Sequence, residues 1–175
     1  NVTGYWYLDA PANWTPPADL LNFLEAGEPP VYIGFGSMGS RSPEKAGQIA
    51  LEALALSGRR GVLATGWGGL QASDLPKTVH LITSIPHSWL FERMATVVHH
   101  GGAGTTAAGI RAGVPTVTVP YMGDQAFWGK RMAELGVGTT PIPRKKLDSR
   151  LLSEAIHEAV TNTTMQRRAF ELSQQ

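Results

Sequence analysis

The sequence predicts an α/β fold built on a doubly wound parallel sheet of about six strands. Short apolar runs of about five residues alternate with helical patterns of about ten residues along the chain. No hairpin signal such as Asn-Gly joins one apolar run to the next, so neighbouring strands are expected to be parallel and connected by helices. Several helical patterns also close on a glycine, as helix C-termini commonly do.

The elements follow from the chain in order. Residues 1–29 are rich in Pro, Trp and Asn, and within them only residues 19–26 show a helical pattern. Six strands are predicted, at 31–35, 61–65, 79–83, 95–99, 115–119 and 139–142. Further helices are predicted between or after these strands: 43–57, 88–94, 105–112, 125–135, 149–160 and 164–172.

Capping residues justify the helix boundaries. Ser42 followed by Pro43 is a start signal, and Asp148 and Thr163 are expected to cap the last two helices. Glycine closes three other helices, at Gly58, Gly113 and Gly136.

Composition excludes several classes of protein. The 175 residues fit one domain, and a formal net charge of +1 is too balanced for a nucleic-acid-binding surface. The absence of cysteine excludes disulfides and thiolate metal sites. The chain has neither an apolar run of about 18 residues nor an N-terminal signal pattern, so we expect a cytoplasmic protein with no transmembrane segment. Peripheral membrane contact stays compatible with this composition.

The 20 glycines gather after the predicted strands. Glycine-rich loops follow the first strand at 34–39, the second at 66–69 and the fourth at 101–104, and Gly123 follows the fifth. Ligands of open parallel sheets bind outside the carboxyl ends of the strands, where glycine lets the backbone approach them. Tight turns explain any one such loop, but four loops on one edge favour a ligand site.

The first loop, from Gly34 to Gly39, has the glycine spacing of dinucleotide-binding folds. The rest of that pattern is missing, because the helix is predicted to start later, at Pro43, and the second strand ends at Thr65 without a carboxylate for a ribose. The chain also has no G-x-x-x-x-G-K-[ST] motif. Nicotinamide binding and P-loop phosphoryl transfer are therefore disfavoured.

The segment from His99 to Thr106 joins a predicted strand end to a helix N-terminus. Free N–H groups and the helix dipole make such a terminus an anion site. Thr105 and Thr106 add hydroxyl donors, and the ring of His100 can donate to a phosphate oxygen. The segment predicts a diphosphate site that needs neither a metal nor a cofactor. The alternative is that the histidines only end a strand and the threonines only cap a helix.

Asp124 and Gln125 open the helix after the fifth strand, beside this loop. A carboxylate and an amide together suit sugar hydroxyls, although an ordinary Asp N-cap is the alternative interpretation. The five histidines do not have metal-ligand spacing, and no Ser/His/Asp triad with credible spacing is present. Hydrolysis by a triad or a metal is therefore disfavoured.

Together these residues resemble a known family. The segment His99–Pro115 and the triplet Gly123-Asp-Gln125 resemble the donor-binding signature of inverting family 1 glycosyltransferases with the GT-B fold, in which two Rossmann-like domains bind acceptor and donor. Residues 30–38, 85–91 and 124–129 are similar, more narrowly, to sterol 3-β-glucosyltransferases and their bacterial relatives. The resemblance covers about residues 29–147, and its combined motifs are specific.

The resemblance implies a donor-binding domain for a UDP-sugar, with UDP-glucose as the expected donor. Residues 29–175 would form this domain, and residues 1–28 would connect it to the acceptor-binding domain. Ser37, His100 and the following helix start would hold the diphosphate, residues 85–87 the base, and the Asp-Gln pair the sugar. The donor-binding residues implied are Ser37, Trp67, Ile85, His87, His100, Gly102, Gly104, Thr105, Thr106, Asp124 and Gln125.

Two positions depart from the family pattern. Ser84 stands where many relatives stack a Trp on uracil, which leaves Trp67 or Trp89 as candidates for stacking. Residues 106–109 lack the Glu with which those relatives bind the ribose. UDP is favoured by the resemblance, and TDP stays open.

Nothing in the chain matches the family's first domain, which binds the acceptor and supplies the catalytic base. The resemblance therefore implies no catalytic residue in this chain, nucleotide binding without transfer, and an N-terminal acceptor-binding domain as the partner. The acceptor would be sterol-like or another lipophilic natural product. The alternatives are a standalone donor subunit, or a non-catalytic nucleotide-sugar-binding module that needs a partner chain.

Overall fold

Five strands pair into one parallel sheet in the computed structural model, which describes residues 5–7, 9–35, 43–64 and 75–175. They are β1 (Val31–Gly34), β2 (Gly61–Ala64), β3 (Val79–Ile82), β4 (Thr96–His99) and β5 (Thr116–Thr118). The order across the sheet is β3-β2-β1-β4-β5, and every pairing is parallel. The predicted fold class is confirmed.

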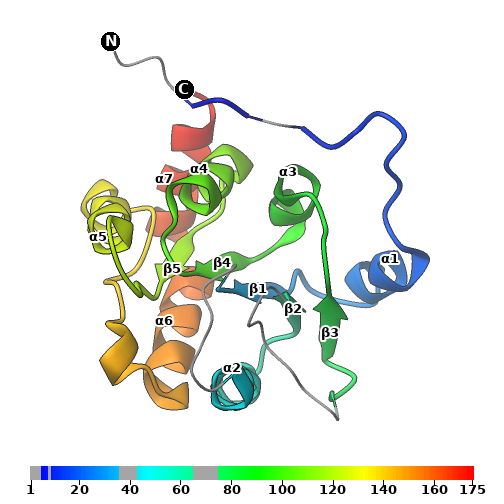
Figure 1. Ribbon diagram of the computed structural model, residues 1–175, viewed down its shortest axis with the longest axis horizontal. Helices are drawn as coiled ribbons and strands as arrows, with labels where there is room; N and C mark the ends of the chain where they lie inside the picture. Colours follow the sequence, from blue (N-terminus) through cyan, green and yellow to red (C-terminus); the bar gives the residue numbers. More distant parts are fainter. Residues whose placement is uncertain (1–4, 8, 36–42, 65–74) are drawn as a thin grey trace.

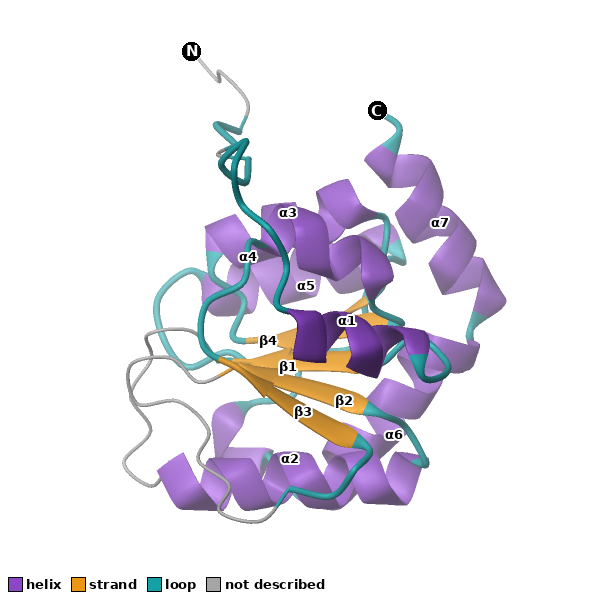
Figure 2. Ribbon diagram, turned by 90° about the vertical axis from the view of Figure 1, so that its right-hand side faces the viewer, coloured by secondary structure: helices purple, strands orange, loops and turns teal. Residues whose placement is uncertain are grey.

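Helices cover both faces of this sheet (Figures 1 and 2). In chain order they are α1 (Ala18–Glu25), α2 (Pro43–Ser57), α3 (His87–Leu90), α4 (Ala103–Ala112), α5 (Gln125–Leu135), α6 (Ser149–Thr161) and α7 (Thr163–Ser173), with 3₁₀ turns at Phe91–Arg93 and Arg144–Lys146. Figure 1 shows α2 and α6 below the sheet and α3, α4 and α7 above it. None of the helices within the described ranges is long and apolar enough to cross a membrane.

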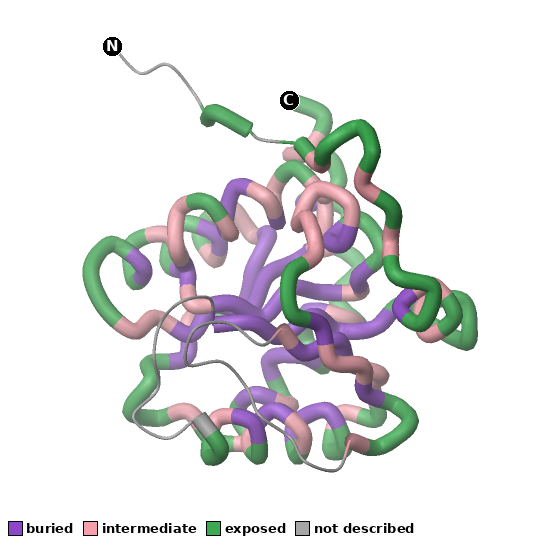
Figure 3. The backbone as a smooth tube through the Cα atoms, turned by 45° about the vertical axis from the view of Figure 1, so that its right-hand side comes forward, coloured by how far each residue is buried: buried purple, intermediate pink, exposed green. Residues whose placement is uncertain are grey.

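Alternation along the strands builds the two halves of the core. Ile33 of β1 points to the face of α2 and α6, where it belongs to one buried cluster with Leu54 and Ile156. Tyr32, the residue before it, points to the opposite face and joins Leu90 and other buried side chains from α1 and α3. Successive side chains of a strand point to opposite faces, so a strand covered on both sides is apolar throughout. In Figure 3 the sheet is accordingly buried, whereas the outer surfaces of the helices are exposed.

The predicted sixth strand at 139–142 is wrong. Its backbone does approach β5, since Thr139 N–H donates to Thr116 O at 3.0 Å and Ile142 N–H donates to Thr118 O at 2.9 Å. Only an isolated bridge forms nearby, between Thr116 and Gly138. Pro141 lies inside the segment, and a proline has no N–H to continue a ladder of hydrogen bonds. An edge segment of this kind therefore follows the sheet without joining it as a strand.

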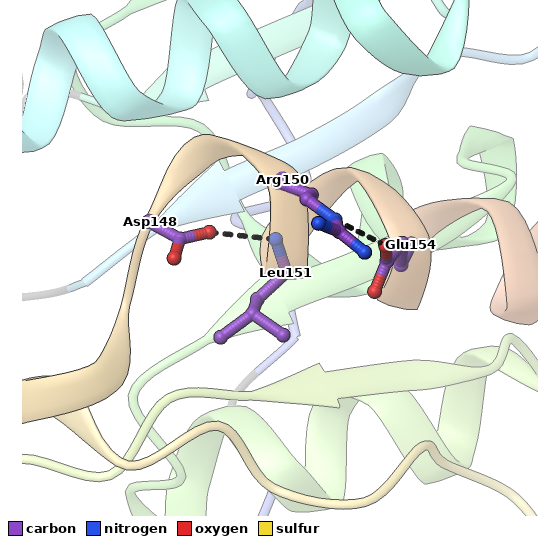
Figure 4. Close-up of polar contacts among 4 residues, drawn as sticks. All are labelled: Asp148, Arg150, Leu151 and Glu154. Carbon is purple, nitrogen blue, oxygen red and sulfur yellow. Dashed lines mark hydrogen bonds and ion pairs between the residues drawn. The ribbon is translucent and has the colours of Figure 1, made fainter.

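The last two helices start at side-chain caps. At the start of α6, Asp148 Oδ1 accepts a hydrogen bond from Leu151 N–H at 2.8 Å, and Arg150 pairs with Glu154 one turn on (Figure 4). The cap of α7 differs from the prediction by one residue, because Asn162 rather than Thr163 accepts from Met165 N–H. An Asn or Asp cap satisfies an N–H that the helix itself leaves without a partner.

The N-terminal helix α1 is fastened to the domain by long-range contacts. Leu20 is fully buried in the core below α1. The guanidinium of Arg60 lies 4.2 Å from the ring centroid of Phe23 and donates to the carbonyl oxygens of Phe23 and Glu28. His80 stacks on the same phenyl ring. The helix that precedes β1 therefore packs on the same domain as the sheet.

Candidate functional site

The central feature of the site is the point at which the chain changes direction across the sheet. The strands β1 and β4 are neighbours, with Gly34 in register with His99, and the chain continues outward from them on both sides. Ligands of doubly wound sheets bind in the crevice at such a switch point. The loop after β4 leads directly into α4 here, so the residues predicted to bind phosphate lie at this point.

The turn from β4 into α4 requires a glycine. Gly101 has a φ of +88°, and an added Cβ there would lie 2.7 Å from Thr118 Cγ2 and 2.8 Å from the carbonyl oxygen of Gln125. Its N–H donates to His99 Nδ1 at 3.0 Å. The loop after β4 is therefore hydrogen-bonded to the end of that strand and packs closely against the start of α5.

The N-terminus of α4 is open to a ligand. Gly102 is the N-cap residue, and no side chain caps the helix. Among the described residues, no side chain therefore caps the first N–H groups of the helix. Gly104 has no heavy atom within 4 Å of the place where a Cβ would stand, so open space lies in front of this turn. The terminus thus combines the positive end of the helix dipole with free donors.

The two threonines of this turn differ. Thr106 is buried, and its hydroxyl donates to Gly102 O at 3.0 Å, so in this structure it serves the helix. Thr105 is partly exposed and lines the pocket in front of the helix. The sequence alone does not show which of two adjacent helical threonines is buried, because that depends on how the helix packs.

Three histidines surround the switch point. Burial lowers the pKa of His99 to about 3, with smaller effects from His100 and His87, so this fully buried ring is neutral. His100 is half-buried, and burial also lowers its pKa. Its Nε2 lies 2.5 Å from where a Cβ of Gly102 would stand, and its Nδ1 is buried without a hydrogen-bond partner in the described part of the chain. His100 therefore lies against the start of α4 as a neutral ring with unused hydrogen-bonding capacity.

The loop before α3 forms one side of the site. Ile85 and His87 both line the pocket. The ring of His87 stacks on Phe91 at 4.4 Å between centroids and lies edge-on to Tyr32 at 5.9 Å. Burial, and then the nearby His100, lower the pKa of His87. These contacts fix the imidazole, so the wall that it contributes is rigid.

The start of α5 carries the predicted sugar-binding pair. Gln125 is buried, and its Oε1 accepts from the N–H groups of Tyr121 and Met122 at 2.7 and 3.0 Å. This orients the amide so that its NH₂ group is the part that remains for a ligand. Asp124 makes no capping hydrogen bond, and its Oδ2 accepts instead from Trp128 Nε1 at 2.9 Å. The carboxylate is therefore held by a side chain one turn on, contrary to the N-cap interpretation.

A pocket of about 450 Å³ extends from the start of α4. One wall is formed by residues 85–88, which lead into the first turn of α3, together with Glu92, and another is the face of α4 that carries Thr105, Ala108 and Arg111. The third wall is the N-terminal segment Tyr5–Tyr7. This wall was not predicted from the sequence, because it depends on a contact with α4 across about one hundred residues.

Several predicted residues fall elsewhere. Ser37 and Trp67 lie outside the described residues. Trp89 does not line the pocket, because it packs edge-on against Trp14 at 5.2 Å and under the guanidinium of Arg93. In the described ranges, no group of three or more His, Asp or Glu side chains is arranged to hold a metal ion.

A doubly wound parallel sheet with an open helix N-terminus at its switch point defines a Rossmann-like fold. Solved glycosyltransferases have this fold. The glycosyltransferase of kitacinnamycin superposes with a TM-score of 0.75 at 24% identity, over 95% of this chain and 43% of that one. The structure of Arabidopsis thaliana UGT89C1 complexed with UDP superposes with a TM-score of 0.74 at 21% identity, over 91% of this chain and 42% of that one. The chain therefore has the fold of one half of a GT-B glycosyltransferase.

The chain belongs to the family described as Erythromycin biosynthesis protein CIII-like, C-terminal domain, whose model matches residues 67–175. It is 50% identical over 158 residues to the sterol 3-beta-glucosyltransferase UGT80A2 of Arabidopsis thaliana, covering 90% of this chain and 25% of that protein. It is 42% identical over 186 residues to a sterol 3-beta-glucosyltransferase of Aspergillus oryzae, covering 99% of this chain and 13% of that protein. The chain thus spans a quarter or less of these relatives.

Proposed function

We propose that this chain is the donor-binding domain of a glycosyltransferase that uses a UDP-sugar, with UDP-glucose as the donor. The observation that carries the proposal is the N-terminus of α4, which has no side-chain cap and whose first-turn residues Gly104 and Thr105 line a pocket of about 450 Å³. A volume of this size is typical of small-molecule sites. The domain comprises residues 29–175, and residues 1–28 connect it to an acceptor-binding domain.

The diphosphate lies at the start of α4. The helix dipole and the free N–H groups attract its negative charge, and Thr105 adds a hydroxyl donor. His100, which burial keeps neutral, donates from its ring. When the sugar is transferred, its bond to the diphosphate breaks and negative charge develops on the leaving oxygen. Donors already aimed at that charge stabilise the transition state more than the ground state.

The sugar lies toward the start of α5. Gln125 offers its NH₂ group because its oxygen is already bound by two backbone N–H groups. Asp124 has one oxygen on Trp128 and the other available to a sugar hydroxyl. A carboxylate acceptor beside an amide donor matches neighbouring hydroxyls, each of which both donates and accepts.

Transfer itself requires the rest of the enzyme. The relatives named sterol 3-beta-glucosyltransferase are about four to eight times as long as their match to this chain. We propose that a base on the acceptor-binding domain takes the proton of the acceptor hydroxyl, whose oxygen then attacks the sugar carbon with inversion. The acceptor is a sterol or a similar lipophilic alcohol, and this domain alone binds the donor without transferring it.

The Asp124→Ala variant tests the roles assigned to the two ends of the site. We expect it to bind UDP as the parent chain does, but to bind UDP-glucose about 10- to 100-fold more weakly, which is the usual effect of losing a charged hydrogen bond. Calorimetric titration with each ligand measures this difference.

Glu134→Ala is the matched control for this variant. Glu134 is an acidic residue on the same helix whose carboxylate pairs with Lys130 and Arg131, so its removal is expected to leave both affinities unchanged. An equal loss of UDP and UDP-glucose in Asp124→Ala would show that Asp124 does not face the sugar.

A further inference from the structure

The N-terminal segment lies along the site although it is about one hundred residues away in the sequence from α4. Tyr5, Trp6 and Tyr7 line the same pocket as residues 85–88 at the start of α3. Figure 2 shows this segment above α3 and α4. Tyr5 is 42% exposed and Tyr7 48%, whereas Trp6 is 86% exposed. The two tyrosines are thus about half-covered, whereas Trp6 is largely exposed to solvent.

An ion pair fastens the segment to α4. Arg111 Nη1 lies 2.7 Å from Asp9 Oδ1, and the same guanidinium lies 4.6 Å from the ring centroid of Tyr7. The rings of Tyr5 and Tyr7 are 5.6 Å apart. Arg111 therefore joins the helix that begins at the phosphate site to the segment that carries the tyrosines.

The N-terminal segment contacts α4 at Arg111, which lies at the other end of the helix from the proposed phosphate site. Arg111 is seven residues beyond Gly104, which is about 10 Å along a helix. Between them, Ala108 presents only a methyl group to the pocket. The far end of the pocket is therefore lined by the aromatic residues 5–7 and by Ile85, together with the charged side chains of Arg111 and Glu92. The aromatic part of this lining suits a flat ring.

We propose that Tyr5 and Tyr7 form the stacking wall for the nucleobase of the donor, held in place by the pair between Asp9 and Arg111. This inference rests on the proposed function. It assigns to the N-terminal segment the aromatic contact that Ser84 cannot make, and it assigns to Asp9 and Arg111 a positioning role. A base between Tyr5–Tyr7 and Ile85 would be connected through its ribose, beside Ala108, to phosphates at the start of α4.

The test uses the 175-residue chain and two probes, UDP and inorganic diphosphate. We expect a variant with Tyr5→Ala and Tyr7→Ala to bind UDP at least about tenfold more weakly, as expected for the loss of base stacking, and to bind inorganic diphosphate unchanged. Asp9→Asn, which leaves both rings in place, is expected to lower UDP affinity about threefold in the same selective way. Phe170→Ala removes an exposed ring on α7 and is the matched control.

Two results would overturn the inference. UDP affinity within about twofold of the parent chain in the double variant would show that the rings do not contact the base. An equal loss of UDP and inorganic diphosphate would show that the segment only supports the phosphate site. A loss of UDP binding in His100→Ala together with normal binding in the double variant would refute this inference alone. A parent chain that does not bind UDP would refute the proposed function as well.

Discussion

Replacing Gly101 by alanine is expected to lower the free energy of unfolding by about 3 kcal/mol. The left-handed conformation at φ +88° costs about 1–2 kcal/mol for a residue with a Cβ. The new methyl would also lie 2.8 Å from the backbone oxygen of Gln125, and forcing an extra carbon into a packed site costs about 1–3 kcal/mol. Urea unfolding followed by circular dichroism measures the change.

Gly104→Ala is the matched control for this prediction. Gly104 lies three residues on, in a helical conformation, and an added Cβ there meets nothing within 4 Å. Alanine is a better helix former than glycine, so this variant is expected to be as stable as the parent chain or to gain up to about 1 kcal/mol. Equal destabilisation by the two substitutions would contradict the described geometry of the turn between β4 and α4.

Replacing His100 by alanine is expected to weaken UDP binding about 10- to 100-fold, which corresponds to the loss of one hydrogen bond to a charged phosphate. The ring lies against Gly102 at the start of α4, where we propose that the diphosphate binds. His100→Asn, which keeps an N–H donor, is expected to recover part of the affinity. Isothermal titration calorimetry at constant pH measures each dissociation constant.

His157→Ala controls for the general loss of a histidine. His157 is exposed on α6, on the opposite face of the sheet from α4, and its removal is expected to leave UDP affinity unchanged. Unchanged UDP binding in a folded His100→Ala chain would show that the diphosphate does not lie at this ring.

The strands were predictable from the sequence because a sheet covered on both faces needs uninterrupted apolar runs, such as the one from Val31 to Ile33. The segment at 139–142 reads Thr-Thr-Pro-Ile, which contains β-branched residues but no continuous apolar run. Pro141 lacks the N–H that a paired strand position needs, and this backbone requirement outweighed the β-branched pattern. Side-chain pattern alone therefore overestimated the sheet by one strand.

The position of the site was also predictable, because parallel strands bring their carboxyl ends to one edge and the glycines follow those ends. The directions in which individual polar side chains point could not be predicted from the sequence. Thr106 and Gln125 both carry groups suited to a ligand, yet packing directs the hydroxyl of one and the oxygen of the other to the backbone. The wall formed by residues 5–7 depends on a contact with α4 across about one hundred residues, which no local pattern indicates.

Calorimetric titration of the 175-residue chain with UDP tests the assignment of a donor-binding domain most directly. A donor site at the start of α4 predicts saturable one-to-one binding with a dissociation constant below about 1 mM, competition by UDP-glucose, and a weaker constant in His100→Ala. The absence of binding to the folded chain at millimolar UDP would contradict it, and so would UDP binding that is the same in the parent chain and in His100→Ala.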